Sequence, residues 1–221
     1  MNIRNSIVTL FLILTPSTWA QEPGQDLTPT AWGQKQMSDV IKTMPDTLLP
    51  YLDASKRTEL IDFYKMGVEA KTTNKFSGET VLDTLSAHYA QLQLSESSTL
   101  QLLLLPQDDA DTLICAVRTY LGEAPESTVS FYATDWHPLD ASLYLPPLSP
   151  MALVERPDTM SVEQYETVLK TLDPIMLAAR IEADGTLVWT VSAPLLSAAE
   201  RKALASVALQ RKLKWNGKTF N

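Results

Sequence analysis

Residues 79–132 place the strongest constraint on the fold, because short strand patterns occupy most of this segment. Runs of apolar and β-branched residues that are bounded by polar turn residues are typical of β-strands. Turns of only a few residues separate the later runs, and connections this short join antiparallel neighbours. The segment therefore predicts about five antiparallel strands, at residues 80–85, 88–94, 99–105, 112–121 and 128–132.

Two helices are predicted before these strands. Four apolar residues recur at the spacing of one helix face: Met37, Val40, Ile41 and Met44. Pro45 ends that pattern, because proline cannot continue a helix. A second helix is predicted between residues 50 and 67, with Asp53 or Ser55 as its N-cap and Gly67 at its carboxyl end.

The C-terminal half contains two more helix starts, each marked by a capping box: Ser161 with Gln164, and Ser197 with Glu200. These helices are predicted to run to about residues 172 and 208. Strands at 175–183 and 186–192 flank Asp184-Gly185, which predicts a hairpin with a type I′ turn, and a last short strand follows at 212–215. The predicted fold class is α+β, a mainly antiparallel sheet with two N-terminal helices and two helices in the C-terminal half.

Length and charge limit the classes of protein that fit. The chain has 221 residues, of which 45% are hydrophobic and 20% charged, enough for one core of ordinary size. We therefore expect residues 21–221 to form a single α+β domain. The formal net charge of −8 disfavours a nucleic-acid partner.

The amino terminus resembles a secretory signal peptide. Arg4 gives a positive start, residues 7–14 form an apolar run, and small residues at Thr18 and Ala20 suit a signal peptidase. We expect cleavage after Ala20 and a periplasmic or otherwise extracytoplasmic protein, with no transmembrane segment in the mature chain. The alternative is a cytoplasmic amphipathic or buried first helix.

Motifs of the commoner active sites are absent from the sequence. Cys115 is the only cysteine, so an intramolecular disulfide is excluded. It lies in an apolar strand pattern that predicts core positions for Leu113, Cys115 and Val117. His88 and His137 are the only histidines, and no metal-binding, nucleotide-binding or serine-hydrolase motif occurs. We expect neither a metal nor a cofactor.

Asp135, Trp136 and His137 are the candidate binding residues, because they lie on a predicted loop and include an aromatic side chain. In a second interpretation they form a structural corner, in which Trp136 is buried and Pro138 fixes the chain. In a third, His137 and Asp135 join a Ser or Thr from another segment in a hydrolytic site, since a triad depends on geometry rather than on spacing.

Several separate motifs occur along the chain, namely MPDTLLPYL at 44–52, LIDFY at 60–64, GVEAK at 67–71, FY at 131–132 with WHPL at 136–139, and RPD at 156–158. Together they resemble an uncharacterised family of exported Bacteroidales proteins, the domain of unknown function DUF3256. The resemblance extends over nearly the whole mature chain. It implies a signal peptide and an extracytoplasmic α+β domain, and it implies no activity.

Export and the lack of catalytic motifs favour a non-catalytic binding protein of the bacterial cell envelope. Its partner is expected to be another protein or an envelope component, bound through the sheet or the Trp136 loop. The alternative function is a hydrolase with a dispersed Ser/Thr-His-Asp site.

Asp-Thr-aliphatic tripeptides are a further pattern, similar to the acceptor sequence for O-linked glycans on exported Bacteroidales proteins. The candidate acceptors are Thr112, Thr159 and Thr47, while Thr84, inside a predicted strand, is the weakest match. A glycan requires a surface position. The alternative is that Asp-Thr serves only as turn and N-cap chemistry.

Overall fold

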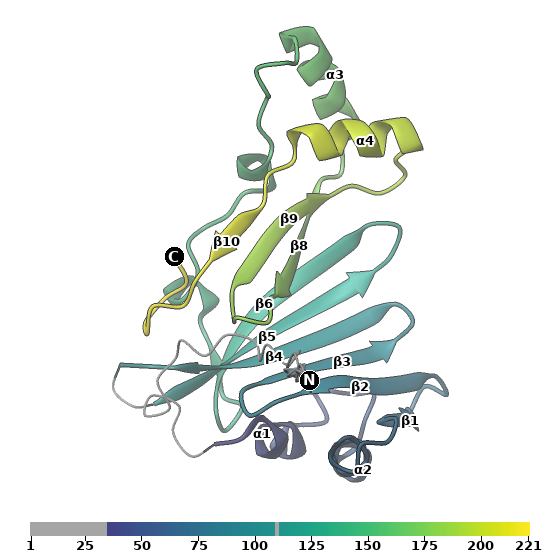
Figure 1. Ribbon diagram of the computed structural model, residues 1–221, viewed down its shortest axis with the longest axis vertical. Helices are drawn as coiled ribbons and strands as arrows, with labels where there is room; N and C mark the ends of the chain where they lie inside the picture. The colour runs from purple at the N-terminus through teal and green to yellow at the C-terminus, as the bar shows by residue number, and fades with distance from the viewer. Residues whose placement is uncertain (1–34, 109–110) are drawn as a thin grey trace, which may run out of the picture.

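A seven-stranded antiparallel sheet is the largest element of the structure, a computed structural model that describes residues 35–108 and 111–221 (Figure 1). The predicted signal peptide lies outside the described residues. Each strand pairs with the next along the chain, in the order β1 (Lys71–Thr73), β2 (Glu79–Leu85), β3 (Tyr89–Ser95), β4 (Ser98–Pro106), β5 (Thr112–Leu121), β6 (Pro125–Ala133) and β7 (Pro138–Leu139).

One face of this sheet packs against α1 (Met37–Thr43) and α2 (Ala54–Lys65), which lie below it in Figure 1. Leu92, Leu102 and Ile114 are fully buried between the sheet and these helices. Successive side chains of a strand point to opposite faces, so alternate residues of β3 to β5 form this core.

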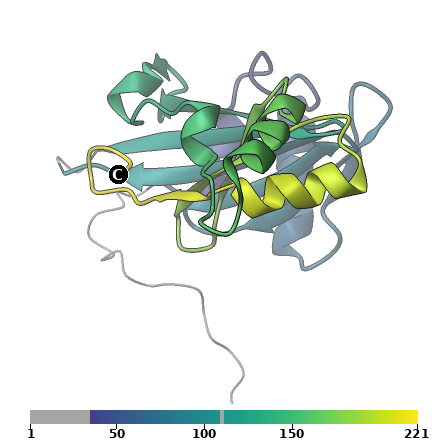
Figure 2. The same cartoon turned by 90° about the horizontal axis from the view of Figure 1, so that it is seen from above.

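The opposite face carries a second, three-stranded antiparallel sheet in the order β10 (Arg211–Leu213), β9 (Leu187–Ser192), β8 (Met176–Ile181) (Figure 1). Two short 3-10 helices, η2 (Ala141–Leu143) and η3 (Pro150–Leu153), precede it. Figure 2 shows α3 (Val162–Thr171) and α4 (Ala198–Val207) side by side above the sheets. No helix in the described part of the chain is long and apolar enough to cross a membrane.

The predicted α+β class, with its antiparallel sheet and two pairs of helices, is confirmed. Leu113, Cys115 and Val117 are at most 5% exposed and lie in the core between the two sheets, as their alternation predicts. Burial raises the pKa of the Cys115 thiol, so the side chain remains protonated and behaves as a small apolar group.

Local capping signals position three of the helices. The Asp53 carboxylate accepts a hydrogen bond from the backbone N–H of Lys56, 2.9 Å away, and so begins α2. Both predicted capping boxes are present, at the starts of α3 and α4. These starts are confirmed because a cap depends only on residues within one helical turn.

The hairpin between β8 and β9 is confirmed, but its predicted type I′ turn is wrong. That turn needs positive φ at both central residues, and only Gly185 has it, at 79°. The Glu182 N–H donates to the Thr186 carbonyl, so residues 183–185 form a three-residue loop with glycine in the left-handed conformation.

The outer edge of β8 is bonded to side chains of the large sheet rather than to another strand. Ser127 on β6 accepts a hydrogen bond from the Ala179 N–H (2.9 Å) and donates one to the Ala179 carbonyl (3.2 Å). Gln101 on β4 accepts one from the Ile181 N–H (3.0 Å) and donates one to the Ile181 carbonyl (3.1 Å). Two polar side chains therefore take the place of a neighbouring strand along this edge.

Replacing Gln101 with leucine should destabilise the protein, because the N–H and carbonyl of Ile181 lose their partners. We expect Gln101→Leu to lower the free energy of unfolding by about 2–4 kcal/mol in urea titrations followed by circular dichroism. Gln93→Leu is the matched control, since Gln93 makes no hydrogen bond through its side chain among the described residues. Equal effects of the two substitutions would contradict this account of how β8 is held.

Candidate functional site

The Trp136 side chain belongs to the core and not to a binding surface. It is 5% exposed, its indole N–H donates to the Val40 carbonyl at 3.2 Å, and its ring lies 5.5 Å from that of Tyr132. Trp136 has a positive φ of 70°, which turns the chain sharply at this point. The corner interpretation of this loop therefore describes the structure, and Trp136 offers no surface to a ligand.

Asp135 and His137 are exposed, but they do not form a catalytic pair. The Asp135 carboxylate accepts a hydrogen bond from the backbone N–H of His137 at 3.1 Å, an arrangement of turns rather than of triads. Within the described residues, no Ser or Thr hydroxyl is hydrogen-bonded to the His137 ring. The same part of the chain contains no cluster of three or more His, Cys, Asp or Glu residues that could hold a metal ion.

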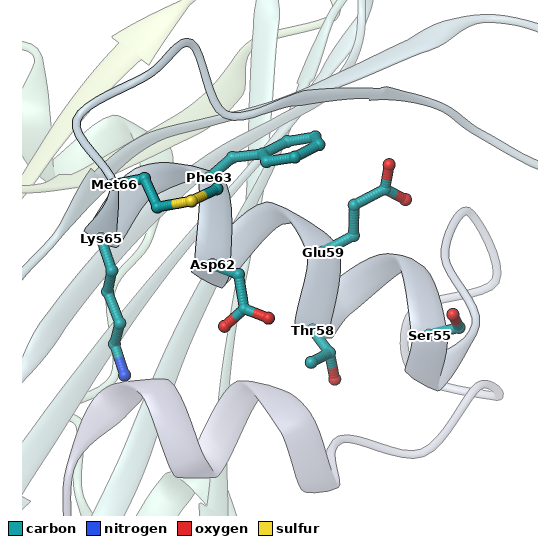
Figure 3. Close-up of a pocket in the computed structure, with 7 residues that line it drawn as sticks. All are labelled: Ser55, Thr58, Glu59, Asp62, Phe63, Lys65 and Met66. Atoms are coloured by element: carbon teal, nitrogen blue, oxygen red, sulfur yellow. The ribbon is translucent and has the colours of Figure 1, made fainter.

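A hollow of about 900 Å³ lies along α2 (Figure 3). Figure 3 shows Thr58 and Asp62 on one side of the helix and Glu59 and Phe63 on the other. All of its lining residues come from this one helix and its C-cap residue, Met66. Because their polar groups do not converge on a common point, this open surface is not a candidate site.

A second hollow, of about 360 Å³, lies where the two sheets meet, and we call it the inter-sheet crevice. The large sheet contributes residues of β3 to β6, and the small sheet contributes residues of β8 and β9. Its lining is Gln91, Thr99, Gln101, Thr119, Pro125, Ala178, Ala179, Arg180 and Thr190.

A hydrogen-bond network fixes the side-chain amides of Gln91 and Gln101, which line the inter-sheet crevice. The Tyr89 hydroxyl donates to Oε1 of Gln91 at 3.0 Å and accepts a hydrogen bond from Nε2 of Gln101 at 2.7 Å. Burial raises the pKa of Tyr89, so its hydroxyl keeps its proton at neutral pH. The two amides are therefore held in place before any ligand arrives.

Two uncharged side-chain groups of the residues that line the inter-sheet crevice have no hydrogen-bond partner among the described residues. They are Nε2 of Gln91 and the hydroxyl of Thr99. Arg180, the one charged residue of the lining, is exposed and paired with Glu182 through a contact of 3.0 Å, and Glu182 is also paired with Lys212. The crevice can thus offer fixed, uncharged hydrogen-bonding groups beside one cationic side chain.

Residues 31–220 match a family described as a protein of unknown function, DUF3256. The chain belongs to the DUF3256 family. It is also similar to the solved structure of a domain of an uncharacterized protein from Porphyromonas gingivalis W83, with 20% sequence identity and a TM-score of 0.67. That match covers 85% of this chain and 97% of the other, and at this identity it shows a shared fold. No curated protein matches the chain.

Sequence reasoning missed the crevice residues of this DUF3256 protein. The available signal was the alternation in β3, where Ala90, Leu92 and Leu94 are buried while Gln91 and Gln93 face the other side. The alternation identifies a polar sheet face, but it does not show which segment covers that face. Gln101 and Ile181, which meet there, are 80 residues apart in the sequence.

The candidate glycan acceptors differ in exposure. Thr112 is only 6% exposed at the start of β5, so its predicted surface position is wrong and it cannot project a glycan. Thr47, in the turn after α1, and Thr159, just before α3, are both exposed. The pattern therefore leaves Thr47 and Thr159 as the acceptors to test.

We expect the intact mass of protein purified from its native host to exceed that of a bare chain beginning at Gln21. The excess should disappear in the double variant Thr47→Ala, Thr159→Ala, whereas Thr112→Ala should leave it unchanged, because a buried hydroxyl is inaccessible to a transferase. A mass equal to that of the bare chain would rule out glycosylation. A mass that includes residues 1–20 would rule out cleavage after Ala20.

Proposed function

We propose that this DUF3256 protein is an exported, non-catalytic binding protein of the cell envelope whose ligand occupies the inter-sheet crevice. The observation that carries the proposal is the convergence of both sheets on a hollow with fixed polar groups. Gln91 and Thr99 line this hollow, and each has a polar side-chain group without a partner among the described residues. Fixed polar groups in a concave site are typical of ligand recognition.

Export is part of the proposal and is supported by the amino terminus. Its positive residue, short apolar run and small residues before Gln21 are the three parts of a signal peptide. The predicted partner, an envelope component or another protein, follows from that location.

The alternative hydrolase has weaker support. Its first candidates were His137 and Asp135, but the hydrogen bond between these residues uses the histidine backbone, which leaves the ring unoriented by the carboxylate. The Cys115 thiol cannot replace a hydroxyl nucleophile, because it is fully buried and protonated. No observation favours a second function.

Retention of envelope material tests the proposal. The purified protein is immobilised and exposed to a detergent extract of the host envelope, and the retained material is measured by mass spectrometry and sugar analysis. We expect Thr99→Trp to abolish retention, because the indole fills the inter-sheet crevice. Thr128→Trp is the matched control, since Thr128 is exposed on the opposite face of the large sheet, and it should retain as much material as the unmodified chain.

Equal retention by the Thr99→Trp and Thr128→Trp variants would overturn the crevice as the binding site. Absence of retained material with the unmodified protein would overturn the binding function itself.

A further inference from the structure

The chemistry of the inter-sheet crevice is that of amides and hydroxyls. Gln91, Gln101, Thr99, Thr119 and Thr190 supply its polar side chains apart from Arg180. Arg180 is exposed and already paired with Glu182, which is also paired with Lys212, so the one charged side chain of the lining is a cation. A cationic ligand would therefore be desolvated here without a compensating partner, and most of the lining offers uncharged hydrogen-bonding groups.

Amide and hydroxyl groups match a ligand whose groups both donate and accept hydrogen bonds. A primary amide has donors on its nitrogen and an acceptor on its oxygen, and a hydroxyl can act in either role. Oε1 of Gln91 already accepts from the Tyr89 hydroxyl, which leaves the Gln91 Nε2 hydrogens as donors beside the Thr99 hydroxyl. Vicinal hydroxyl groups on one ring would meet both roles at once.

An extended peptide fits the crevice less well. A peptide added to a sheet edge is recognised chiefly through backbone hydrogen bonds. The outward backbone groups of Ala179 and Ile181 on β8 are already bonded to Ser127 and Gln101. The N–H and carbonyl groups of these two residues are therefore not available to pair with a bound peptide.

An apolar ligand is also disfavoured. The apolar residues of the lining are small, namely Pro125, Ala178 and Ala179. Sites for apolar molecules are lined mainly by large aliphatic and aromatic side chains. These small residues suit the C–H groups of a sugar ring lying against them.

We propose that the inter-sheet crevice binds a neutral saccharide of one or two sugar units. The proposal rests on the proposed function, because it names the ligand class of the same site. Its volume of about 360 Å³ lies near the lower end of the range for small-molecule sites.

Nuclear magnetic resonance titration of ¹⁵N-labelled protein tests this assignment. The probes are the neutral disaccharides maltose, cellobiose, lactose and N,N′-diacetylchitobiose, with glucuronate and a blocked triglycine as charged and peptide comparators. We expect at least one disaccharide to shift the side-chain amide signals of Gln91 and Gln101 saturably at millimolar concentration, and neither comparator to do so.

Matched variants localise the binding. Gln91→Ala and Thr99→Val should each weaken the disaccharide Kd by about tenfold, the effect of losing one good hydrogen bond. Thr128→Val, on the opposite sheet face, should change the Kd by less than about twofold. Equal weakening by all three variants would overturn the site. Unchanged far-ultraviolet circular dichroism shows that a variant is folded, and Thr99→Val provides the test if Gln91→Ala disturbs the network.

The remaining outcomes separate this inference from the proposed function. No shift with any disaccharide, combined with envelope material that is retained by the unmodified protein and lost in Thr99→Trp, would overturn the saccharide and leave the binding function intact. Shifts with glucuronate or triglycine alone would assign a charged or peptide ligand instead. Failure of both the titration and the retention experiment would overturn both proposals.

Discussion

The attachment of the small sheet to the large sheet depends on the hydrogen bonds made by the outer edge of β8. A strand edge that is buried must find partners for its N–H and carbonyl groups. Ser127 and Gln101 provide them for Ala179 and Ile181, and they come from two different strands of the large sheet. The small sheet is consequently attached to the large sheet along this edge, and α3 and α4 lie at the end of the small sheet that is farther from the large sheet (Figure 1).

The same requirement explains why the face of the large sheet toward the small sheet changes from apolar to polar along its strands. Cys115 and Phe131 belong to the apolar core between the sheets, whereas Gln101 and Thr119, farther along the strands, are polar. Polar side chains are needed where the edge of β8 contacts the large sheet, because an apolar face would leave the backbone N–H and carbonyl groups of β8 unpaired. Gln91, which lies beside Gln101, extends this polar region into the open crevice.

Features set by nearby residues were predictable from the sequence, and features set by distant ones were not. Asp53 and the capping boxes fix helix starts within one turn, and the longer strands were recognised from local patterns. The strands β1 and β7, with three and two residues, are too short to show the alternation of apolar and polar residues by which a strand is recognised. Trp136 was placed correctly only in the alternative interpretation, because its burial depends on Val40, 96 residues away.

Amide hydrogen exchange at Ala179 and Ile181 tests the edge bonding most directly. Both N–H groups donate to side-chain oxygens at 2.9 and 3.0 Å, so we expect protection comparable to that of amides in the β8–β9 ladder. Exchange of these two amides at the rate of exposed, unbonded groups, while that ladder remains protected, would contradict it.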